Sequence, residues 1–309
     1  MKSLRLGTRG SKLALWQSEH VAVKLRQSHP DLKVELNIIK TTGDKILDVA
    51  LSKIGDKGLF TKEIEKELLE GRIDLAVHSM KDLPTQLEKG LVIGAVLERE
   101  NPADVLISDR NYTFASLPPG ARIGTSSLRR IAQLKKLRPD LVFVEMRGNV
   151  ETRIRKMRDE NLDGIVLAYA GVKRLGMEGA ISEILSCEVI LPAVGQGVIA
   201  IETRSDDSEI LSLLEAINDK NAYLSCKAER AFLQGLEGGC QVPIASLATV
   251  NNDKILLQGL IAALDGSEVI KSCNEGSCRE AELVGQQLAI TLLDRGAGRI
   301  LNDIRRAGG

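Results

Sequence analysis

The stretch LRLGTRGSKLALWQSEHVAVKLRQ, residues 4–27, contains one strand and one helix of the predicted fold. Residues 4–8 form a short run suited to a buried strand, and residues 12–27 place apolar side chains along one side of a helix. A strand that leads directly into a helix is the first part of a βαβ unit. This stretch therefore predicts an α/β fold with a mostly parallel sheet.

The same alternation continues through the first two-thirds of the chain. Further strands are predicted at residues 34–39, 73–77, 91–97, 105–108, 122–125, 141–146, 164–168 and 198–202. Helices are predicted at 127–137 and 150–158, and Phe60, Ile64 and Leu68 form another helical stripe. The alternation predicts several βαβ units in series.

Two polar breaks interrupt this pattern, and the last ninety or so residues differ from the rest. The breaks are E-R-E-N-P-A-D at 98–104 and P-A-V-G-Q-G at 192–197. A chain of 309 residues exceeds the size at which one hydrophobic core usually keeps growing. The C-terminal part predicts a small α+β domain, with helices near 222–233 and around Leu288 and strands at 244–250, 255–263 and 268–273. Gly296 is expected to end the last helix.

Composition excludes several classes of protein. The formal net charge is zero, so no global charge attracts nucleic acid. The chain contains no apolar run of membrane-spanning length and no apolar N-terminal stretch typical of a signal peptide, so we expect a cytoplasmic protein, or an organellar one after removal of a transit peptide. Five cysteines make a poor disulfide framework, and three scattered histidines do not suggest a metal site.

Cations cluster at the predicted helix starts, where acidic side chains are normally favoured by about 0.3–1 kcal/mol. The four clusters are Arg9 with Lys12, Lys57 with Lys62, Arg129 with Arg130, and Arg147 with Arg153. Backbone N–H groups and guanidinium groups at strand ends form anion sites in α/β proteins. The clusters predict a cleft for a ligand with several carboxylates or phosphates. The alternative for any single cluster is an ordinary solvated surface cation. A P-loop and a G-x-G-x-x-G motif are both absent from the sequence, so a nucleotide is not the first choice of ligand.

One carboxylate lies where α/β enzymes place catalytic groups. Asp82 belongs to H-S-M-K-D-L-P at 78–84, directly after the predicted strand 73–77. The adjacent Lys81 favours its ionised form. The alternative is a loop aspartate that precedes a turn proline.

One thiol lies in a glycine-rich loop, G-G-C-Q-V-P at 238–243. The two glycines leave room beside Cys240, and a nearby cation cluster would lower its pKa. The alternative is a small buried hydrophobic side chain, the usual role of cysteine in cytosolic proteins.

Nine segments, in this order, resemble the porphobilinogen deaminase family, also called hydroxymethylbilane synthases. They are T-R-G-S-K-L-A-L-W-Q (8–17), T-T-G-D (41–44), G-D-K-G-L-F-T-K-E-I-E (55–65), D-L-A-V-H-S-M-K-D-L-P (74–84), I-G-T-S-S-L-R-R (123–130), R-G-N-V-E-T-R (147–153), G-V-K-R-L-G (171–176), L-P-A-V-G-Q-G (191–197) and E-G-G-C-Q-V-P (237–243). Single segments are weak signals, but nine in register are specific. Residues 251–277 match only loosely.

The resemblance implies an α/β fold with two periplasmic-binding-protein-like βαβ lobes and a small C-terminal α+β domain. The first lobe would comprise 1–98 and 198–217, the second 103–192, and the C-terminal domain 220–309. The implied activity joins four porphobilinogen molecules, with loss of ammonia, and releases the linear tetrapyrrole hydroxymethylbilane for haem biosynthesis. The implied cofactor is a dipyrromethane, attached by a thioether to Cys240, which serves as an anchor. No metal is implied.

The resemblance also implies residue roles. Asp82 would stabilise the cation formed when ammonia leaves. Cofactor carboxylates would be held by Ser79, Lys81, Thr125, Ser126, Ser127, Arg129, Arg130 and Asn149. The incoming pyrrole and elongation intermediates would be held by Arg9, Ser11, Gln17, Arg147, Arg153 and Arg174, with Phe60 packed against a ring.

Two other functions are compatible with parts of the sequence. A non-catalytic, two-lobed binding protein for a small anion accounts for the cations but not for the Gly-Gly-Cys loop. A thiol-dependent acyl or alkyl transferase would use Cys240 directly and keep it open to alkylation. We expect a monomer whose partner is the small molecule porphobilinogen, with no nucleic acid and no membrane.

Overall fold

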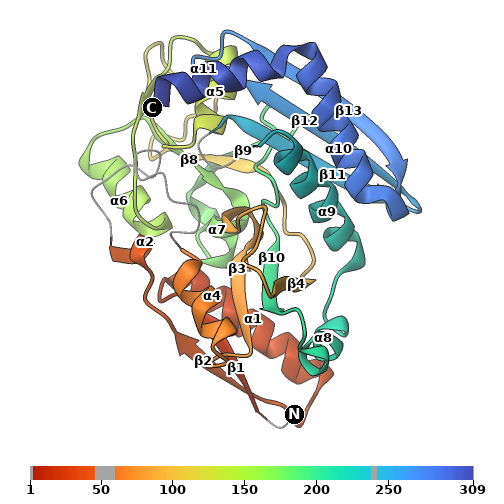
Figure 1. Cartoon of the computed structure of the whole chain (residues 1–309). Coiled ribbons are helices and arrows are strands. Elements are labelled where there is room, and N and C mark those ends of the chain that lie inside the picture. The colour runs from red at the N-terminus through yellow and green to blue at the C-terminus, as the bar shows by residue number, and fades with distance from the viewer. Residues whose placement is uncertain (1–2, 46–59, 238–241, 309) are drawn as a thin grey trace. The chain divides into compact units, whose positions relative to one another are not determined.

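The computed structural model describes residues 3–45, 60–237 and 242–308 (Figure 1). Contacts group the chain into two compact units. Unit 1 contains the described residues up to Glu100 together with Gly197–Tyr223, and unit 2 contains Asn101–Gln196 and the residues from Leu224 onward. The chain thus leaves unit 1 once and returns to it at the second polar break.

Unit 1 is built on a five-stranded sheet with the order β2-β1-β3-β10-β4. Its strands are β1 (Ser3–Thr8), β2 (Lys33–Ile38), β3 (Leu75–Ser79), β4 (Leu91–Val96) and β10 (Ile199–Arg204). Strands β1, β2 and β3 are parallel, whereas β10 runs antiparallel to both β3 and β4. Because β4 is antiparallel to β10, it runs in the same direction as β1, β2 and β3, so the sheet is mostly parallel as predicted and β10, which re-enters the unit, is its one reversed strand.

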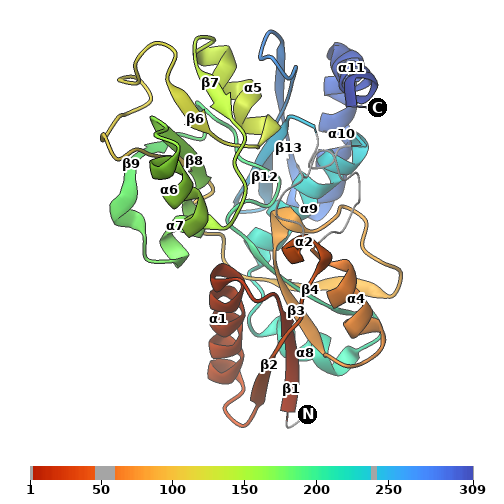
Figure 2. The ribbon, with the colours of Figure 1, turned by 90° about the vertical axis from the view of Figure 1, so that its left-hand side faces the viewer.

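Helices cover both faces of this sheet (Figure 2). On one face, α1 (Lys12–Ser28) and α8 (Ser208–Glu215) pack on β1, β3 and β10 in a core that includes Leu25 and Leu214. On the other face, α4 (Lys62–Leu69) packs Ile64 and Leu68 against Ala76 of β3. A short helix, α2 (Thr42–Lys45), follows β2.

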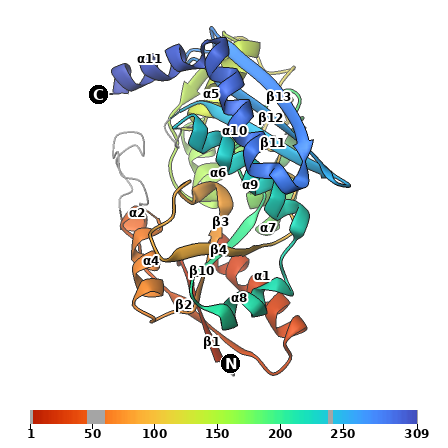
Figure 3. The ribbon, with the colours of Figure 1, turned by 45° about the vertical axis from the view of Figure 1, so that its right-hand side comes forward.

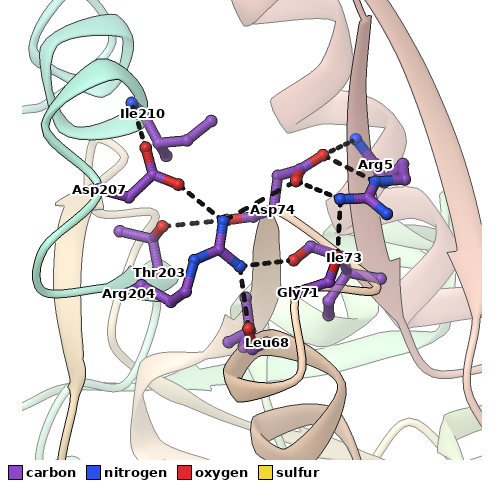
Figure 4. Close-up of polar contacts among 9 residues, drawn as sticks. All are labelled: Arg5, Leu68, Gly71, Ile73, Asp74, Thr203, Arg204, Asp207 and Ile210. Atoms are coloured by element: carbon purple, nitrogen blue, oxygen red, sulfur yellow. Dashed lines mark hydrogen bonds and ion pairs between the residues drawn. The ribbon is translucent and has the colours of Figure 1, made fainter.

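An ionic network fastens the returning strand to the rest of unit 1 (Figure 4). Arg204, at the end of β10, donates to the carbonyls of Leu68 (2.8 Å) and Ile73 (2.9 Å). It also pairs with Asp207 (2.6 Å), whose other oxygen caps α8, and lies 3.8 Å from Asp74. The Asp74 carboxylate in turn pairs with Arg5 of β1 at 2.7 Å. Arg204 thereby holds the end of β10 against residues 68–74, which lie more than a hundred residues earlier in the chain.

Unit 2 contains a second five-stranded sheet with the order β7-β6-β8-β5-β9. Its strands are β5 (Asp104–Ile107), β6 (Arg122–Gly124), β7 (Val142–Val144), β8 (Gly164–Ala168) and β9 (Ile181–Leu185), and its helices are α5 (Leu128–Leu137), α6 (Val150–Asp159) and α7 (Tyr169–Arg174). Strands β6, β7 and β8 are parallel, and β5 is antiparallel to β8 and β9. The order and directions match those of unit 1 strand for strand.

The C-terminal part of unit 2 is an antiparallel sheet covered by helices (Figure 3). The elements are α9 (Lys220–Gly235), β11 (Ile244–Asn251), β12 (Lys254–Ala262), β13 (Val269–Ser277), α10 (Ala281–Leu292) and α11 (Gly298–Gly308). Phe232 and Leu288 meet over Gly259, where an added Cβ would lie 2.6 Å from the Phe232 ring. The opposite face contributes Leu260 to a small core with Ala132 of α5.

The predicted fold class is confirmed: two α/β sheets with a common topology and a small C-terminal α+β region. The sequence did not predict β9, α7 or α11. Gly296 turns the chain with φ of 100°, as expected of a helix end, but another helix follows it. The division into three domains stays a prediction. None of the described helices has the length and apolarity needed to cross a membrane.

Candidate functional site

Six predicted site residues line one pocket in unit 1. The carboxyl ends of the parallel strands β1 and β3 meet there beside the start of α1 and the residues that precede α4, which is the edge where α/β proteins bind ligands. The predicted members of the lining are Arg9, Ser11, Gln17, Phe60, Ser79 and Asp82, and the others are Leu13, Ala14, Thr61, Val77 and His78.

One corner of the pocket is positive. Ser11 caps α1, and its Oγ accepts a hydrogen bond from the Ala14 N–H at 3.3 Å. The first turn of α1, all of it described, carries no acidic side chain that would offset the helix dipole. The Arg9 guanidinium carbon lies 4.1 Å from the centroid of the Phe60 ring, a cation–π contact. This corner suits a carboxylate attached to a flat ring.

A side-chain hydrogen bond joins α1 to the end of β3. Gln17 is only 3% exposed, and its Nε2 donates to Ser79 Oγ at 2.9 Å. The two residues were predicted to bind substrate and cofactor respectively. The structure places them in contact with each other in the wall of the pocket.

Asp82 is exposed, whereas the turn that carries it is anchored. The turn is a single 3-10 element, Met80–Asp82. The Met80 N–H donates to the Val198 carbonyl at 3.0 Å, and the Met80 side chain is 2% exposed. Lys81, in the same turn, is half-buried. A buried anchor beside an exposed carboxylate holds the carboxylate in a defined place at the pocket.

A buried ionic cluster lies behind the same pocket, and the sequence did not reveal it. His78 Nε2 lies 3.1 Å from Oε2 of Glu202 on β10, and Glu202 is fully buried. Burial raises the pKa of the nearby Glu65. The negative charge of Glu202 adds to this increase, whereas contact with the Thr61 hydroxyl reduces it. The sequence feature that could have indicated this cluster is Glu202, a glutamate within the otherwise apolar strand V-I-A-I-E-T-R at residues 198–204.

In unit 2, the predicted anion ligands Arg129 and Arg130 bind an internal carboxylate. Both are 5% exposed, and they pair with Asp104 at 2.8 and 2.7 Å. They also donate to the carbonyls of Leu191 (2.7 Å) and Val166 (2.9 Å). Burial alone would raise the pKa of Asp104, but the two guanidinium charges outweigh burial and hold this pKa well below its ordinary value. Sequence reasoning missed Asp104 because it was assigned to a polar break.

The serines and threonine before α5 form a compact turn at the end of β6. Thr125 is buried, and its N–H donates to the Val144 carbonyl at 3.0 Å. Ser126 Oγ donates to the Met146 carbonyl (2.9 Å) and accepts from the Met146 N–H (2.8 Å). Ser127 is the N-cap residue of α5. The turn thus connects the ends of β6 and β7.

The remaining candidates of unit 2 gather at the start of α6 and the end of α7. Asn149 caps α6 by accepting a hydrogen bond from the Thr152 N–H at 2.8 Å. Arg153 Nε donates to the Gly148 carbonyl at 2.8 Å, and Arg147 is half-buried immediately before the cap. Arg174 is the last residue of α7. Cys240 and Lys57 lie outside the described residues.

Comparison with known proteins identifies the family. Residues 4–212 match the model described as "Porphobilinogen deaminase, dipyromethane cofactor binding domain", and residues 223–294 match "Porphobilinogen deaminase, C-terminal domain". The curated porphobilinogen deaminase of Syntrophomonas wolfei is 63% identical over 306 residues, which is 99% of this chain and 100% of that one. That of Carboxydothermus hydrogenoformans is 56% identical, over 99% and 98% of the two chains.

Among solved structures, the methionine binding protein MetQ is similar with a TM-score of 0.45 and 13% identity, covering 72% of this chain and 92% of that one. A Salmonella typhimurium periplasmic binding protein with high arginine specificity gives a TM-score of 0.41 at 15% identity, with coverage of 72% and 94%.

Paired α/β sheets with cations at their strand ends define a class of proteins that bind anionic ligands. Within that class, the chain belongs to the porphobilinogen deaminase family. It is therefore a transferase of tetrapyrrole biosynthesis that joins four porphobilinogen molecules, with loss of ammonia, on a dipyrromethane cofactor and releases hydroxymethylbilane. The predicted family, activity, substrate and cofactor are confirmed, and the non-catalytic binding protein is excluded.

The described residues fit a dipyrromethane. This group carries carboxylates and pyrrole N–H groups. The capped, acid-free start of α1 together with Arg9 suits the carboxylates, and the exposed carboxylate of Asp82 suits the N–H groups.

Proposed function

We propose that Asp82 is the catalytic carboxylate of this transferase and that Cys240 holds the cofactor. The observation that carries the proposal is the pocket of unit 1, in which Asp82 is exposed while buried Met80 anchors its turn. A charged group held without freedom to reorganise is the arrangement that stabilises charge developing in a reaction.

Each addition passes through a cation. Ammonia leaves the aminomethyl group of porphobilinogen, and the remaining azafulvene cation is attacked by the free α-carbon of a pyrrole. A dipyrromethane held in this pocket would supply the free α-carbon for the first addition. The Asp82 carboxylate accepts hydrogen bonds from pyrrole N–H groups, which stabilises the cation and aligns the reacting rings.

The positive corner of the pocket would hold the incoming pyrrole. Arg9 and the start of α1, capped by Ser11, bind its carboxylates, and Phe60 packs against its ring. Gln17 and Ser79 complete this wall. Arg147, Arg153 and Arg174 would bind carboxylates of the growing chain. These three arginines are assigned to the substrate because they lie in segments that resemble the family motifs.

Cofactor carboxylates would be held by Lys81 and by residues of unit 2. The unit 2 residues are Thr125, Ser126, Ser127, Arg129, Arg130 and Asn149. For Arg129 and Arg130 the proposal requires that they bind the cofactor while paired with Asp104. Asp104 would then orient the two guanidinium groups rather than compete for them.

The intact mass of the denatured protein, followed by peptide mapping, tests the cofactor attachment. We expect an added mass equal to two deaminated porphobilinogen units on the peptide that contains Cys240. Cys240→Ser should abolish the adduct, whereas Cys273→Ser, which alters an exposed cysteine on β13, should keep it. An adduct on another residue, or a Cys240 thiol that is alkylated in the resting enzyme, would contradict the attachment.

We also propose that the protein acts in the cytoplasm as a monomer, without nucleic acid or membrane partners. The zero net charge and the lack of a long apolar run support this. Light scattering at working concentration should give the mass of one chain.

A further inference from the structure

His78, Glu202 and Glu65 form a buried cluster of titratable side chains behind the pocket of unit 1. Their exposed fractions are 6%, 0% and 7%. They come from β3, β10 and α4 respectively. Since the described residues offer no group of three or more side chains suited to a metal ion, metal binding does not account for the cluster.

The antiparallel register places the histidine and the glutamate on one face of the sheet. His78 is opposite Ala200, and Glu202 is opposite Ala76, so the two side chains are diagonal neighbours. The His78 ring directs Nε2 to Glu202 Oε2 at 3.1 Å. His78 is also among the residues that line the pocket together with Asp82. His78 therefore connects a buried carboxylate to the site where the pyrrole rings react.

Burial makes the charge of Glu202 costly unless a cation accompanies it. Among the described residues, neither the Glu202 oxygens nor His78 Nε2 has a hydrogen-bond partner, and the ring nitrogen lies 3.1 Å from Glu202 Oε2. In the histidine–carboxylate pairs of hydrolases, the carboxylate stabilises the imidazolium that forms when the ring takes up a proton during the reaction.

We propose that His78, supported by Glu202, is the base that removes the proton from the pyrrole α-carbon after each new carbon–carbon bond has formed. This inference rests on the proposed role of Asp82 in the same pocket. With Nε2 lying 3.1 Å from Glu202 Oε2, the other ring nitrogen, Nδ1, is the proton acceptor that the proposal requires. The α-carbon is bonded directly to the pyrrole nitrogen, so a ring whose N–H faces Asp82 brings its α-carbon into the same pocket.

The step balances without a further reactant. The α-carbon–hydrogen bond breaks, and its electron pair returns to the pyrrole ring, which regains aromaticity. The proton passes to His78 Nδ1, and Glu202 stabilises the resulting imidazolium. The imidazolium then releases the proton to solvent, which restores the neutral ring before the next addition.

Porphobilinogen deuterated at its free α-carbon tests the proposal in the holoenzyme. His78→Gln keeps an N–H donor for Glu202 but removes the basic nitrogen. We expect turnover to fall by about 10²–10⁴-fold, and the deuterium isotope effect to exceed that of the unaltered enzyme because proton removal becomes rate-limiting. The matched control is His29→Gln, because the His29 ring lies 3.2 Å from the Leu213 carbonyl and His29 does not line the pocket. It should behave as the unaltered enzyme.

Each added pyrrole unit increases the mass of the protein by the same amount. The rate of mass gain therefore measures carbon–carbon bond formation, however many pyrrole units the enzyme carries at the start. Near-normal turnover in His78→Gln would overturn the proposal. So would slow turnover with an unchanged isotope effect, which would make His78 a positioning residue. Failure of the Asp82 assignment is seen separately, as normal turnover of Asp82→Asn, and leaves the isotope comparison intact.

A binding experiment on the unaltered protein avoids any folding defect. The chain has three histidines, so their imidazole proton NMR signals can be assigned with the two variants. Porphobilinogen methylated at the free α-carbon binds without being able to condense there. We expect it to shift the His78 signal and to leave the His29 signal in place. An unmoved His78 signal at saturating ligand would show that His78 does not touch the pyrrole.

Discussion

The two five-stranded sheets have the same strand order, and each holds a buried carboxylate on its antiparallel fourth strand. In unit 1 this carboxylate is Glu202 of β10, and in unit 2 it is Asp104 of β5. Both are fully buried, but their partners differ. Asp104 pairs with Arg129 and Arg130, whereas Glu202 faces His78.

The partners determine what each carboxylate can do. Arginine remains protonated at any working pH, so the positive charges that pair with Asp104 persist and the cluster has a structural role. Gln196 extends this cluster by donating to Asp104 (2.9 Å) and to the Pro102 carbonyl (2.6 Å), which ties the segment leaving unit 1 to the segment returning to it. The His78 ring beside Glu202 instead carries a nitrogen that can take up a proton, which is the role proposed for it above. The same topology thus holds a buried ionic cluster in one unit and, as we propose, a proton-accepting site in the other.

The largest expected effect is on turnover. Asp82→Asn removes the charge that stabilises the cationic intermediate while it keeps the size of the side chain. We expect turnover to fall by at least about 10²–10³-fold, the loss typical of removing one preorganised electrostatic group. Steady-state assays of porphobilinogen consumption, with circular dichroism as a folding control, measure this. Near-normal turnover would remove Asp82 from the mechanism.

Breaking the Asp104 cluster of unit 2 should chiefly affect stability. Asp104→Asn leaves two buried guanidinium groups without their carboxylate, and losing one member of a buried ionic cluster costs about 3–5 kcal/mol. Urea unfolding measures the change in the free energy of unfolding.

The control is Asp109→Asn, which alters an exposed pair with Arg158 and should leave the free energy of unfolding nearly unchanged. Equal stability of the two variants would contradict the structural role of Asp104.

The pH dependence of stability should have opposite signs in the two clusters. The pKa of Asp104 is lower in the folded protein than in the unfolded one, so its contribution is complete above about pH 4 and is lost as the pH falls. The pKa of Glu65 is raised, so the native state binds more protons and stability falls as the pH rises from about 4.3 through the folded pKa.

Glu65→Gln removes the second of these effects. We expect it to stabilise the protein near neutral pH relative to the unaltered enzyme, and to make little difference below about pH 4, where Glu65 is protonated in both states. Denaturant unfolding at several pH values tests this. If Glu65→Gln and the unaltered enzyme had the same free energy of unfolding at every pH, the charge of Glu65 would not destabilise the folded state.

The smallest expected effect concerns the network in Figure 4, none of whose labelled residues lines the pocket of unit 1. Asp74→Asn weakens its pairs with Arg5 and Arg204, and hydrogen bonds to charged groups contribute about 1.5–3 kcal/mol. Because Arg5 is 42% exposed, the loss should lie at the low end of this range. Turnover without denaturant should be unchanged. A loss of turnover with intact stability would indicate a functional link between this network and the pocket.

The sequence by itself determined the βαβ pattern, the family and the place of Asp82 after a strand. These depend on local features: the period of apolar residues, the turn chemistry around 78–84, and motifs that lie within a few residues of each other. The N-cap role of Asn149 was predictable for the same reason, since the capped N–H belongs to Thr152, three residues away.

Only the tertiary structure decided which charges meet. Arg129 and Arg130 looked like ligands for an external anion because their partner, Asp104, lies 25 residues away in a segment that looked like a linker. Glu202 and His78 come from strands 124 residues apart that pair antiparallel only because the chain returns to unit 1. Charge pairing inside a protein depends on burial and long-range register, and neither is encoded in the residues next to a charged side chain.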